Sequence, residues 1–590
     1  MNRAPPLPAD PPPAVPSRPA RTPLYVMPTE PAPRFKVVLV APRRLPGWLL
    51  RFLELATEHP WLELVVLPIA GESEVPTHPT PLDVRALLAY EGRRKLGTGL
   101  ALVEATPQDG IAFELAIPHD LDTAEMRATV GALRPDLVLL VGAAHWAEAL
   151  GDRAEWGCWE FGRNLTDAVE AAQALLSPVM RGEVATAVEL QLHHLDRPPT
   201  PLAAGWSSTC RASASAQRER AFLRMPGLLM RSLRKLANGE LPVPSQRTAR
   251  LQLAPAPTRW GAGVLTFART LAFRLATRRR ARSNDEAWHI LLRQGAAPID
   301  PDAPDIRQST FLSAPGNRFW ADPCLTVHAG RRLLFVEQWA EGDTKGVIAC
   351  VELAETQARP LGVVLEHPFH LSYPQVFRWE DQWYLTVESG QDKCVRLYRA
   401  EAFPLRWQHV TNLVSGWGFV DPTLHYHDHR WYLFANVGES GGSSCDELFL
   451  FVAERLEGPY RPHPANPVVN DVRRARPAGR LFQRDGRLVR PAQDCAPRYG
   501  AAVVFNEVLE LSPTHYRERP LGRLDTRWTS GLDGCHTYNE AAGVEVLDAR
   551  GTPPRNCDRL PAVETTGVDE ATGSDAVGAY RKVLPVLAKT

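Results

Sequence analysis

The chain of 590 residues is long enough for about two or three domains, and its hydrophobic content of 44% is ordinary for a globular protein. Its 67 basic and 67 acidic residues cancel, so the composition gives no sign of the concentrated basic face that nucleic-acid binding needs. Nine scattered cysteines without a CxxC pair argue against a zinc site and against a disulfide framework.

The N-terminal half alternates buried strands with helical segments. Residues 1–34, rich in Pro and Ala, are predicted to be a disordered lead without the features of a signal peptide. Continuous apolar runs at 35–40, 62–67 and 135–141 are typical of strands buried on both faces. We therefore predict a doubly wound parallel α/β domain over residues 35–245.

Three segments of this half resemble the formyltransferase superfamily: 134–141, 157–161 and 188–196. The resemblance implies a catalytic Asn, His and Asp, and Asp196 matches the Asp. No His follows Phe161, where the family carries one. We interpret the domain as a degenerate, structural or binding unit, and formyl transfer to an amino-sugar is the alternative.

A connector is predicted over residues 246–286. Helical spacing of apolar residues over 260–277 precedes a basic run at 278–282. One interpretation is contact with an anionic membrane surface through 260–282. The interpretation we favour is a linker helix packed on one domain with a solvated basic end. No apolar run approaches the roughly 20 residues of a membrane span, and we expect a cytoplasmic protein.

Residues 287–552 repeat a pattern of short strands five times. The repeats start at 319, 373, 420, 478 and 536, about 50–60 residues apart, which is the length of a four-stranded blade. The spacing predicts an all-β five-bladed propeller, followed by a loose tail at 553–590. The innermost strands of a propeller surround one axis, so the polar residues that open the repeats should meet in one pocket.

Three carboxylates are the candidate chemical groups of that pocket. Asp322 and Asp421 each precede a proline at equivalent repeat positions, and we expect the proline to hold them in an extended conformation. Glu388 comes from the end of a second strand. Carboxylates that share a pocket repel one another, so their pKa values separate, as glycoside cleavage requires of its acid and its nucleophile or base.

Residues 287–552 resemble the five-bladed propellers of glycoside hydrolase families 43, 32 and 68. They resemble still more the N-terminal propeller of the plant glucosamine inositolphosphorylceramide transferases, whose transferase activity is attributed to a separate domain. The resemblance is carried by Phe319–Pro323, Tyr373–Phe377, Glu388-Ser389, Val420–Pro422, Arg476–Arg480, Arg490–Cys495 and Tyr499-Gly500. It implies that Asp322 is nucleophile or base, Asp421 a supporting carboxylate and Glu388 the acid.

Further polar and aromatic residues complete the predicted pocket. Arg forks suit carboxylates or phosphates, Asp and Gln suit sugar hydroxyls, and aromatic rings stack on sugars. An alternative for two of them is that Arg490 pairs with Asp494 to close the ring, and His536 has an equally good structural explanation. The predicted substrate-binding residues are Trp320, Tyr373, Arg480, Arg490, Gln493, Asp494 and His536.

The functional prediction is a carbohydrate-active protein that hydrolyses or transfers a glycosyl unit in the propeller, with a carbohydrate or glycoconjugate substrate. The predicted reaction requires neither a metal nor a cofactor. The alternative is a propeller that binds a glycan or nucleotide-sugar without catalysis, beside a degenerate partner domain.

Overall fold

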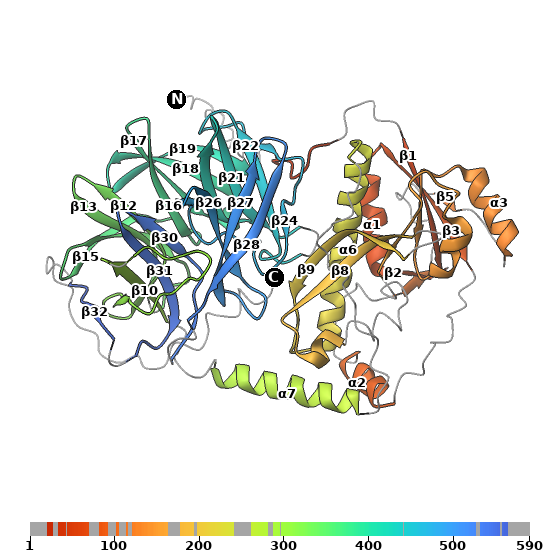
Figure 1. Cartoon of the computed structure of the whole chain (residues 1–590), viewed down its shortest axis with the longest axis horizontal. Coiled ribbons are helices and arrows are strands. Elements are labelled where there is room, and N and C mark those ends of the chain that lie inside the picture. Colours follow the sequence, from red (N-terminus) through yellow and green to blue (C-terminus); the bar gives the residue numbers. More distant parts are fainter. Residues whose placement is uncertain are drawn as a thin grey trace, which may run out of the picture.

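The computed structural model describes residues 21–27, 34–42, 44–69, 82–92, 102–104, 114–115, 121–162, 177–193, 198–240, 261–280, 287–295, 297–340, 342–439, 442–526, 531–554 and 557–563. They form an α/β part and an all-β part that lie side by side, with the helix α7 (Ala262–Arg280) below both in the view of Figure 1. Asp196, the candidate residue of the formyltransferase resemblance, lies outside the described residues.

The α/β part is built on a seven-stranded sheet. Its first five strands in sheet order run parallel, but β8 and β9 pair antiparallel at one edge, so the prediction of a wholly parallel sheet was wrong. Antiparallel neighbours need only a short connection, which periodicity within single strands does not reveal. In sheet order the strands are β5 (Glu114–Leu115), β3 (Leu62–Ile69), β1 (Phe35–Pro42), β6 (Leu137–Leu140), β7 (Cys158–Phe161), β8 (Ala185–His193) and β9 (Thr200–Ser208).

Helices cover both faces of this sheet because successive strand residues point to opposite sides. Val37 and Leu39 face a core shared with α1 (Gly47–Thr57) and α6 (Ala214–Ala237). Val38 and Val40 face a second core. The helices on that second side are α3 (Thr123–Leu133) and α4 (Ala147–Leu150). The remaining elements of the α/β part are β2 (Arg44–Pro46), β4 (Leu102–Glu104), α2 (Leu82–Gly92) and η2 (Ala144–Trp146).

The all-β part is a five-bladed propeller, which confirms the prediction from the repeats. The first four blades are antiparallel sheets. The predicted starts at 319, 373 and 420 lie in the first strands of blades one to three, and the start at 478 lies four residues before the first strand of blade four. Blade one is β12–β15 (Arg318–His328, Arg331–Ala340, Val347–Leu353, Ala358–Leu365), and blade two is β16–β19 (Ser372–Trp379, Gln382–Glu388, Cys394–Ala402, Arg406–Ser415). Blade three is β20–β24 (Phe419–His427, Arg430–Val437, Glu447–Ala453, Arg461–Pro462, Val469–Asn470). Blade four is β25–β28 (Phe482–Arg484, Arg487–Asp494, Ala502–Leu511, Tyr516–Leu524).

The fifth blade closes the ring by joining both ends of the propeller sequence. The C-terminal β31 pairs along its length with β10, which precedes the first repeat, so strands from both ends of the propeller sequence share one sheet. The strand β32 pairs with β11, which corrects the prediction of a loose tail for residues 559–560. The strands are β29 (Leu532–Gly534), β30 (Tyr538–Ala541), β31 (Val544–Gly551), β10 (Trp288–Gln294), β11 (Thr310–Leu312) and β32 (Arg559–Leu560).

Residues 21–27 pack on the propeller, so the prediction of a disordered lead was wrong for this segment. Leu24 is 2% exposed within the core of the second and third blades. The Trp417 indole donates to the Thr22 carbonyl oxygen at 2.9 Å, and the Arg21 guanidinium lies 3.4 Å from the centroid of the same ring. An apolar anchor and a cation–π contact fix a segment whose composition alone predicts disorder.

Buried ion pairs join the two parts. Arg224 of α6 pairs with Asp446 and with Glu447 of β22, the latter at 3.2 Å. Arg231, two turns further along α6, pairs with Glu447 at 2.9 Å. The side chains of Arg224, Arg231 and Glu447 are 4–6% exposed, so breaking this interface would leave charges uncompensated in a dry contact.

Candidate functional site

The first three blades open on the same backbone irregularity. The inner strands bulge between Ala321 and Cys324, between Ser372 and Gln375, and between Val420 and Thr423. The residue before proline in each bulge has a positive φ: 51° at Asp322, 48° at Tyr373 and 48° at Asp421. We predicted extended backbone for the two aspartates, and that was wrong because the bulge, rather than the proline, sets their conformation.

These bulges turn side chains from the strand pleat toward the propeller axis. A left-handed conformation of a residue with a Cβ costs about 1–3 kcal/mol, and surrounding contacts must compensate for it. At Asp421 the compensation comes from three donors. Arg476 Nε lies 2.6 Å and Gln493 Nε2 2.5 Å from Oδ2, and Arg476 Nη2 lies 3.3 Å from Oδ1. Asp421 is 2% exposed, so its carboxylate is fully engaged inside the protein.

Asp322 sits in a second polar cluster on the axis. Its Oδ2 accepts from the Tyr373 amide at 3.1 Å, and its Oδ1 accepts from the Thr537 hydroxyl at 2.8 Å. His536 Nε2 lies 3.6 Å from Oδ1, and the other ring nitrogen of His536 pairs with Asp548. Asp548 also accepts the amides of residues 536 and 537. The cluster links blade one to blade five.

The surroundings in this second cluster raise the pKa of both Asp322 and His536. Burial raises the pKa of Asp322 to about 8. Burial by itself lowers the pKa of His536, but the carboxylates of Asp548 and Asp322 raise it to about 9. Ligand atoms of the three side chains lie within 4.8 Å of one another and could hold a metal ion.

Two further carboxyl groups border the axis. The Glu388 carboxylate accepts the Asp421 amide at 3.0 Å and lies 3.8 Å from Arg476 Nη2. Burial and the nearby Asp421 carboxylate raise the pKa of Glu388 well above its usual range. Burial raises the pKa of Glu337 to about 7, although its carboxylate accepts from the Trp339 indole at 2.5 Å. Both groups hold protons more firmly than solvated carboxylates do.

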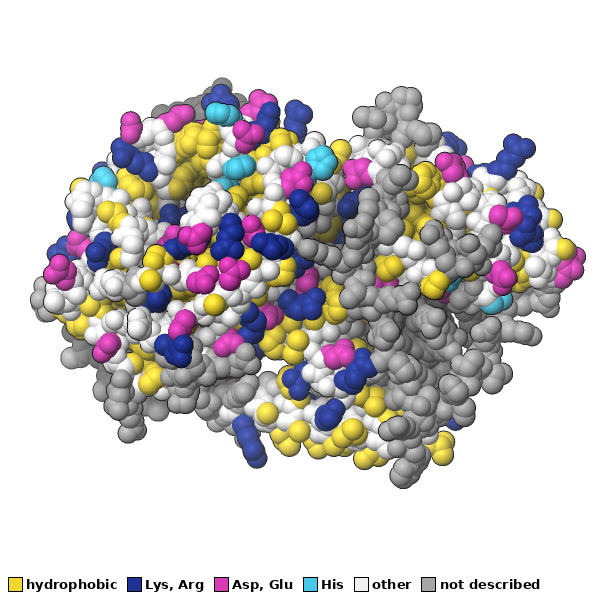
Figure 2. All heavy atoms as spheres, viewed as in Figure 1, with side chains coloured by type: hydrophobic (Ala, Val, Ile, Leu, Met, Phe, Trp, Pro, Cys, Tyr) yellow, Lys and Arg dark blue, Asp and Glu magenta, His cyan; other side chains and the backbone are white. Residues whose placement is uncertain are grey.

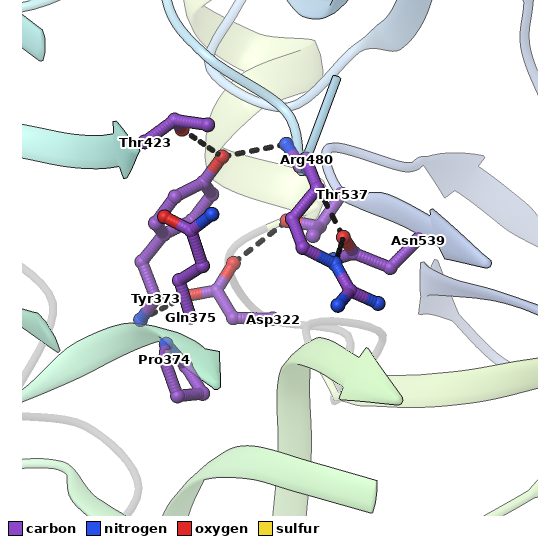
Figure 3. A pocket seen from close by; sticks show the side chains of 9 residues that line it. Asp322, Tyr373, Pro374, Gln375, Thr423, Arg480, Thr537 and Asn539 are labelled. Atoms are coloured by element: carbon purple, nitrogen blue, oxygen red, sulfur yellow. Dashed lines mark hydrogen bonds between the residues drawn. The ribbon is translucent and has the colours of Figure 1, made fainter. Parts of the chain in front are cut away.

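The space beside Asp322 is small. The cavity there has a volume of about 10 Å³, and a volume of roughly this size accommodates a single water molecule. Figure 3 shows the Asp322 carboxylate directed at Thr537 and the Tyr373 hydroxyl directed at Thr423. The lining residues are Asp322, Tyr373, Pro374, Gln375, Thr423, Gly479, Arg480, Thr537 and Asn539.

Several predicted substrate-binding residues are structural in their contacts. Trp320 is 0% exposed and packs in a core, where its indole donates to Gln338. The predicted ring-closing pair does not form: Arg490 binds Glu518 at 2.8 Å, and Asp494 binds Arg523 at 2.9 Å. Both residues lie on β26, and each binds a residue of β28, two strands away in the same blade, which the sequence spacing does not reveal.

Four other predicted residues do surround the axis. Gln493 holds Asp421, and His536 pairs with Asp548. The Tyr373 hydroxyl accepts from the Gly479 amide at 2.5 Å and contacts the Thr423 hydroxyl at 2.9 Å. Arg480 donates to the carbonyl oxygen of residue 325 at 2.7 Å. These contacts tie blades to one another, so the residues come together as predicted but mainly bind protein groups.

Partly exposed aromatic rings contact the charged residues of the site. Tyr499 is 39% exposed, its ring centroid lies 4.8 Å from the Arg476 guanidinium, and it meets the His536 ring edge to face. Trp288 stacks on the other side of His536, with centroids 4.1 Å apart. Trp339 and Trp288 are half-buried. Trp288 and Tyr499 contact His536, and Trp339 donates to the Glu337 carboxylate; we name these three partly exposed residues the aromatic rim.

Some groups of the site were missed by the sequence reasoning. Arg476 was used only as part of a resemblance, although it is the cation that holds Asp421. Asp548 is an acid within the apolar run of β31, and it is 0% exposed. A buried strand position occupied by a carboxylate is a signal that could have found it, since an unpaired charge there is costly.

The comparisons with known proteins concern the propeller. Residues 294–533 match the sequence model of the family described as "Glucosamine inositolphosphorylceramide transferase 1, N-terminal". A protein named glucosamine inositolphosphorylceramide transferase 1 from Oryza sativa subsp. japonica is 31% identical over 294 residues, covering 49% of this chain and 38% of that protein. Its namesake from Arabidopsis thaliana is 31% identical over 229 residues, covering 38% and 30%. The propeller resemblance expected from the sequence is thereby confirmed.

The chain spans less than two fifths of the length of these relatives. Solved structures similar to the chain include a family 117 glycoside hydrolase from Zobellia galactanivorans (TM-score 0.31, 12% identity, 45% of this chain and 92% of that one). Another is a family 32 β-fructofuranosidase from Bombyx mori (TM-score 0.31, 12% identity, 48% and 61%). The family match lies within residues 294–533, so the resemblance of residues 35–245 to formyltransferases stays a prediction.

Proposed function

We propose that the propeller binds a glycosyl group of a glycoconjugate at its aromatic rim, as a recognition module. The observation that carries the proposal is the exposed Tyr499 ring, which makes a cation–π contact with Arg476 and an edge-to-face contact with His536. An aromatic face with charged hydrogen-bonding groups beside it offers a sugar both an apolar surface and polar partners. The relatives are named for glucosamine and inositolphosphorylceramide, so amino-sugars and inositol-phosphate glycolipid head groups are the first ligands to test.

The central carboxylates favour binding over catalysis. Asp421 is held by three donors, and Asp322 adjoins a cavity of about 10 Å³. Typical small-molecule pockets have volumes of about 300–1,000 Å³, far above that of this cavity. A nucleophile or base must also reach its reacting atom, and these two groups contact protein donors instead.

Glycosyl hydrolysis or transfer is the second candidate, favoured by the pKa values of the acidic groups. Glu388 has a strongly raised pKa beside the Asp421 carboxylate, which Arg476 holds. A carboxyl group whose pKa is raised by its surroundings can act as the general acid in glycoside cleavage. In this candidate Glu388 protonates the leaving oxygen, Asp322 is nucleophile or base and Asp421 orients them, after the rim opens to admit the sugar.

One experiment tests both candidates. The full chain is titrated calorimetrically with amino-sugars and inositol-phosphate glycans, and release of monosaccharide from matching glycosides is measured in parallel. We expect binding without turnover, and Tyr499→Ala should weaken binding about tenfold, or about 1.4 kcal/mol. The control is Tyr426→Ala, because Tyr426 is 38% exposed on the same propeller but belongs to a different aromatic cluster.

The outcomes separate cleanly. Equal binding by wild type and Tyr499→Ala, or an equal loss in Tyr426→Ala, would refute recognition at the rim. Turnover that disappears in Asp322→Asn while binding persists would replace the first candidate with the catalytic one.

A further inference from the structure

The helix α7 exposes its apolar side. Residues three or four positions apart lie on one face of a helix, and four such large apolar residues are 42–62% exposed. Thr266 and Thr270, on the opposite side, are 0% and 3% exposed. The exposed residues are Val264, Phe267, Leu271 and Leu275.

This orientation is the reverse of that of an ordinary surface helix, which buries its apolar stripe against the core. Figure 2 shows hydrophobic side chains along the outer side of α7, with Lys or Arg side chains among them. The surface continues onto α2, which packs against α7 and exposes 73% of Leu82 and 43% of Tyr90. Tyr90 meets Phe267 edge to face at 5.8 Å. We name Leu82, Tyr90, Val264, Phe267, Leu271 and Leu275 the α7 patch.

The charge of α7 has one sign. The helix contains five arginines and no acidic residue. Arg278 and Arg279 are exposed in its last turn, beyond the apolar stripe. An apolar face with basic residues along its edge and end matches the interface of an anionic membrane, where apolar side chains enter the acyl boundary and arginines meet lipid phosphates. No helix among the described residues is long and apolar enough to cross a membrane.

We propose that α7 attaches this protein to the surface of an anionic bilayer, lying in the plane of the interface with the α7 patch toward the lipid. From Val264 to Leu275 the apolar stripe extends over roughly 17 Å at 1.5 Å per residue, enough to lie along the surface. A second copy of the chain is a poorer partner for the α7 patch. It would place two helices together that each carry five arginines and no acidic residue, and these charges would repel one another.

The test is co-sedimentation of the full chain with vesicles of phosphatidylcholine alone or with about 30% phosphatidylglycerol. We expect binding to the anionic vesicles only, and a loss of that binding as NaCl is raised, because salt screens the arginines. Leu271→Glu with Leu275→Glu should reduce the partition constant more than tenfold. Arg278→Gln with Arg279→Gln should reduce it roughly 25-fold, which is about 1 kcal/mol per arginine.

The matched control is Val363→Glu, because Val363 is 47% exposed on β15 of the propeller. It should bind as wild type does, and melting curves should show that every variant is folded. Absence of wild-type binding to anionic vesicles, or equal binding by folded Leu271→Glu/Leu275→Glu, would overturn the proposal. Self-association that these two changes abolish, without vesicle binding, would assign the patch to a second copy instead.

Discussion

Replacing Arg476 with Met should destabilise the propeller more than any surface arginine change. Arg476 is 8% exposed and supplies two of the three donors to the Asp421 carboxylate. It is also the cation nearest Glu388, at 3.8 Å. Met has a similar length but no charge, so the variant leaves Asp421 with the single donor of Gln493 in a dry site.

The expected cost is about 3–5 kcal/mol, since removal of one partner leaves the other charge buried and uncompensated. The matched control is Arg430→Met. Arg430 also pairs with a carboxylate, Glu454, but the two side chains are 39% and 81% exposed. An exposed pair of this kind contributes about 0–1 kcal/mol, because water and salt screen it. The comparison therefore isolates burial from the mere presence of an ion pair.

The assay is urea unfolding followed by tryptophan fluorescence, with the double variant Arg476→Met/Asp421→Asn measured alongside. Neutralising Asp421 removes the uncompensated charge, so the double variant should recover about 1–3 kcal/mol of the loss. A cost for Arg476→Met no larger than that of Arg430→Met would refute the reasoning. So would an additive double variant, because it would mean that the two side chains are not coupled.

The remaining predictions concern pH and the contact between the two parts. The folded-state pKa values of Asp322 and His536, about 8 and 9, exceed their ordinary values of 3.8 and 6.5. The native state therefore binds more protons, and stability should fall as pH rises from 6 to 9. Asp322→Asn should flatten this fall in unfolding curves, and parallel curves would contradict the assignment. Arg224→Met should cost about 3–5 kcal/mol and separate the unfolding midpoints of the two parts, because it leaves the buried Asp446 carboxylate without its cation, while Glu447 keeps Arg231. The control is Arg220→Met, because Arg220 is exposed on the same helix; this variant should behave as wild type. Equal effects of the two changes would contradict stabilisation by the buried ion pairs between the two parts.

Local patterns sufficed to predict the propeller. The spacing of the repeats and the alternation of polar and apolar residues are properties of a few neighbouring residues, and the first strands of blades one to three contain the predicted repeat starts. The proline after Asp322 and Asp421 marked equivalent positions for the same reason. The proline predicted the wrong backbone conformation for those aspartates. A bulge forms between two paired strands, so the sequence of one strand does not encode it.

The state of the site was decided by tertiary structure. Asp421 finds Arg476 at a distance of 55 residues in sequence, and Asp322 finds Thr537 at 215. Such pairings depend on which blades meet at the axis. The sequence therefore identified candidate carboxylates but did not show whether protein donors bind them. The same holds for α7: periodicity predicted a helix with one apolar side, but only packing decides which side faces the protein. The apolar side faces outward because Thr266 and Thr270 occupy the contact.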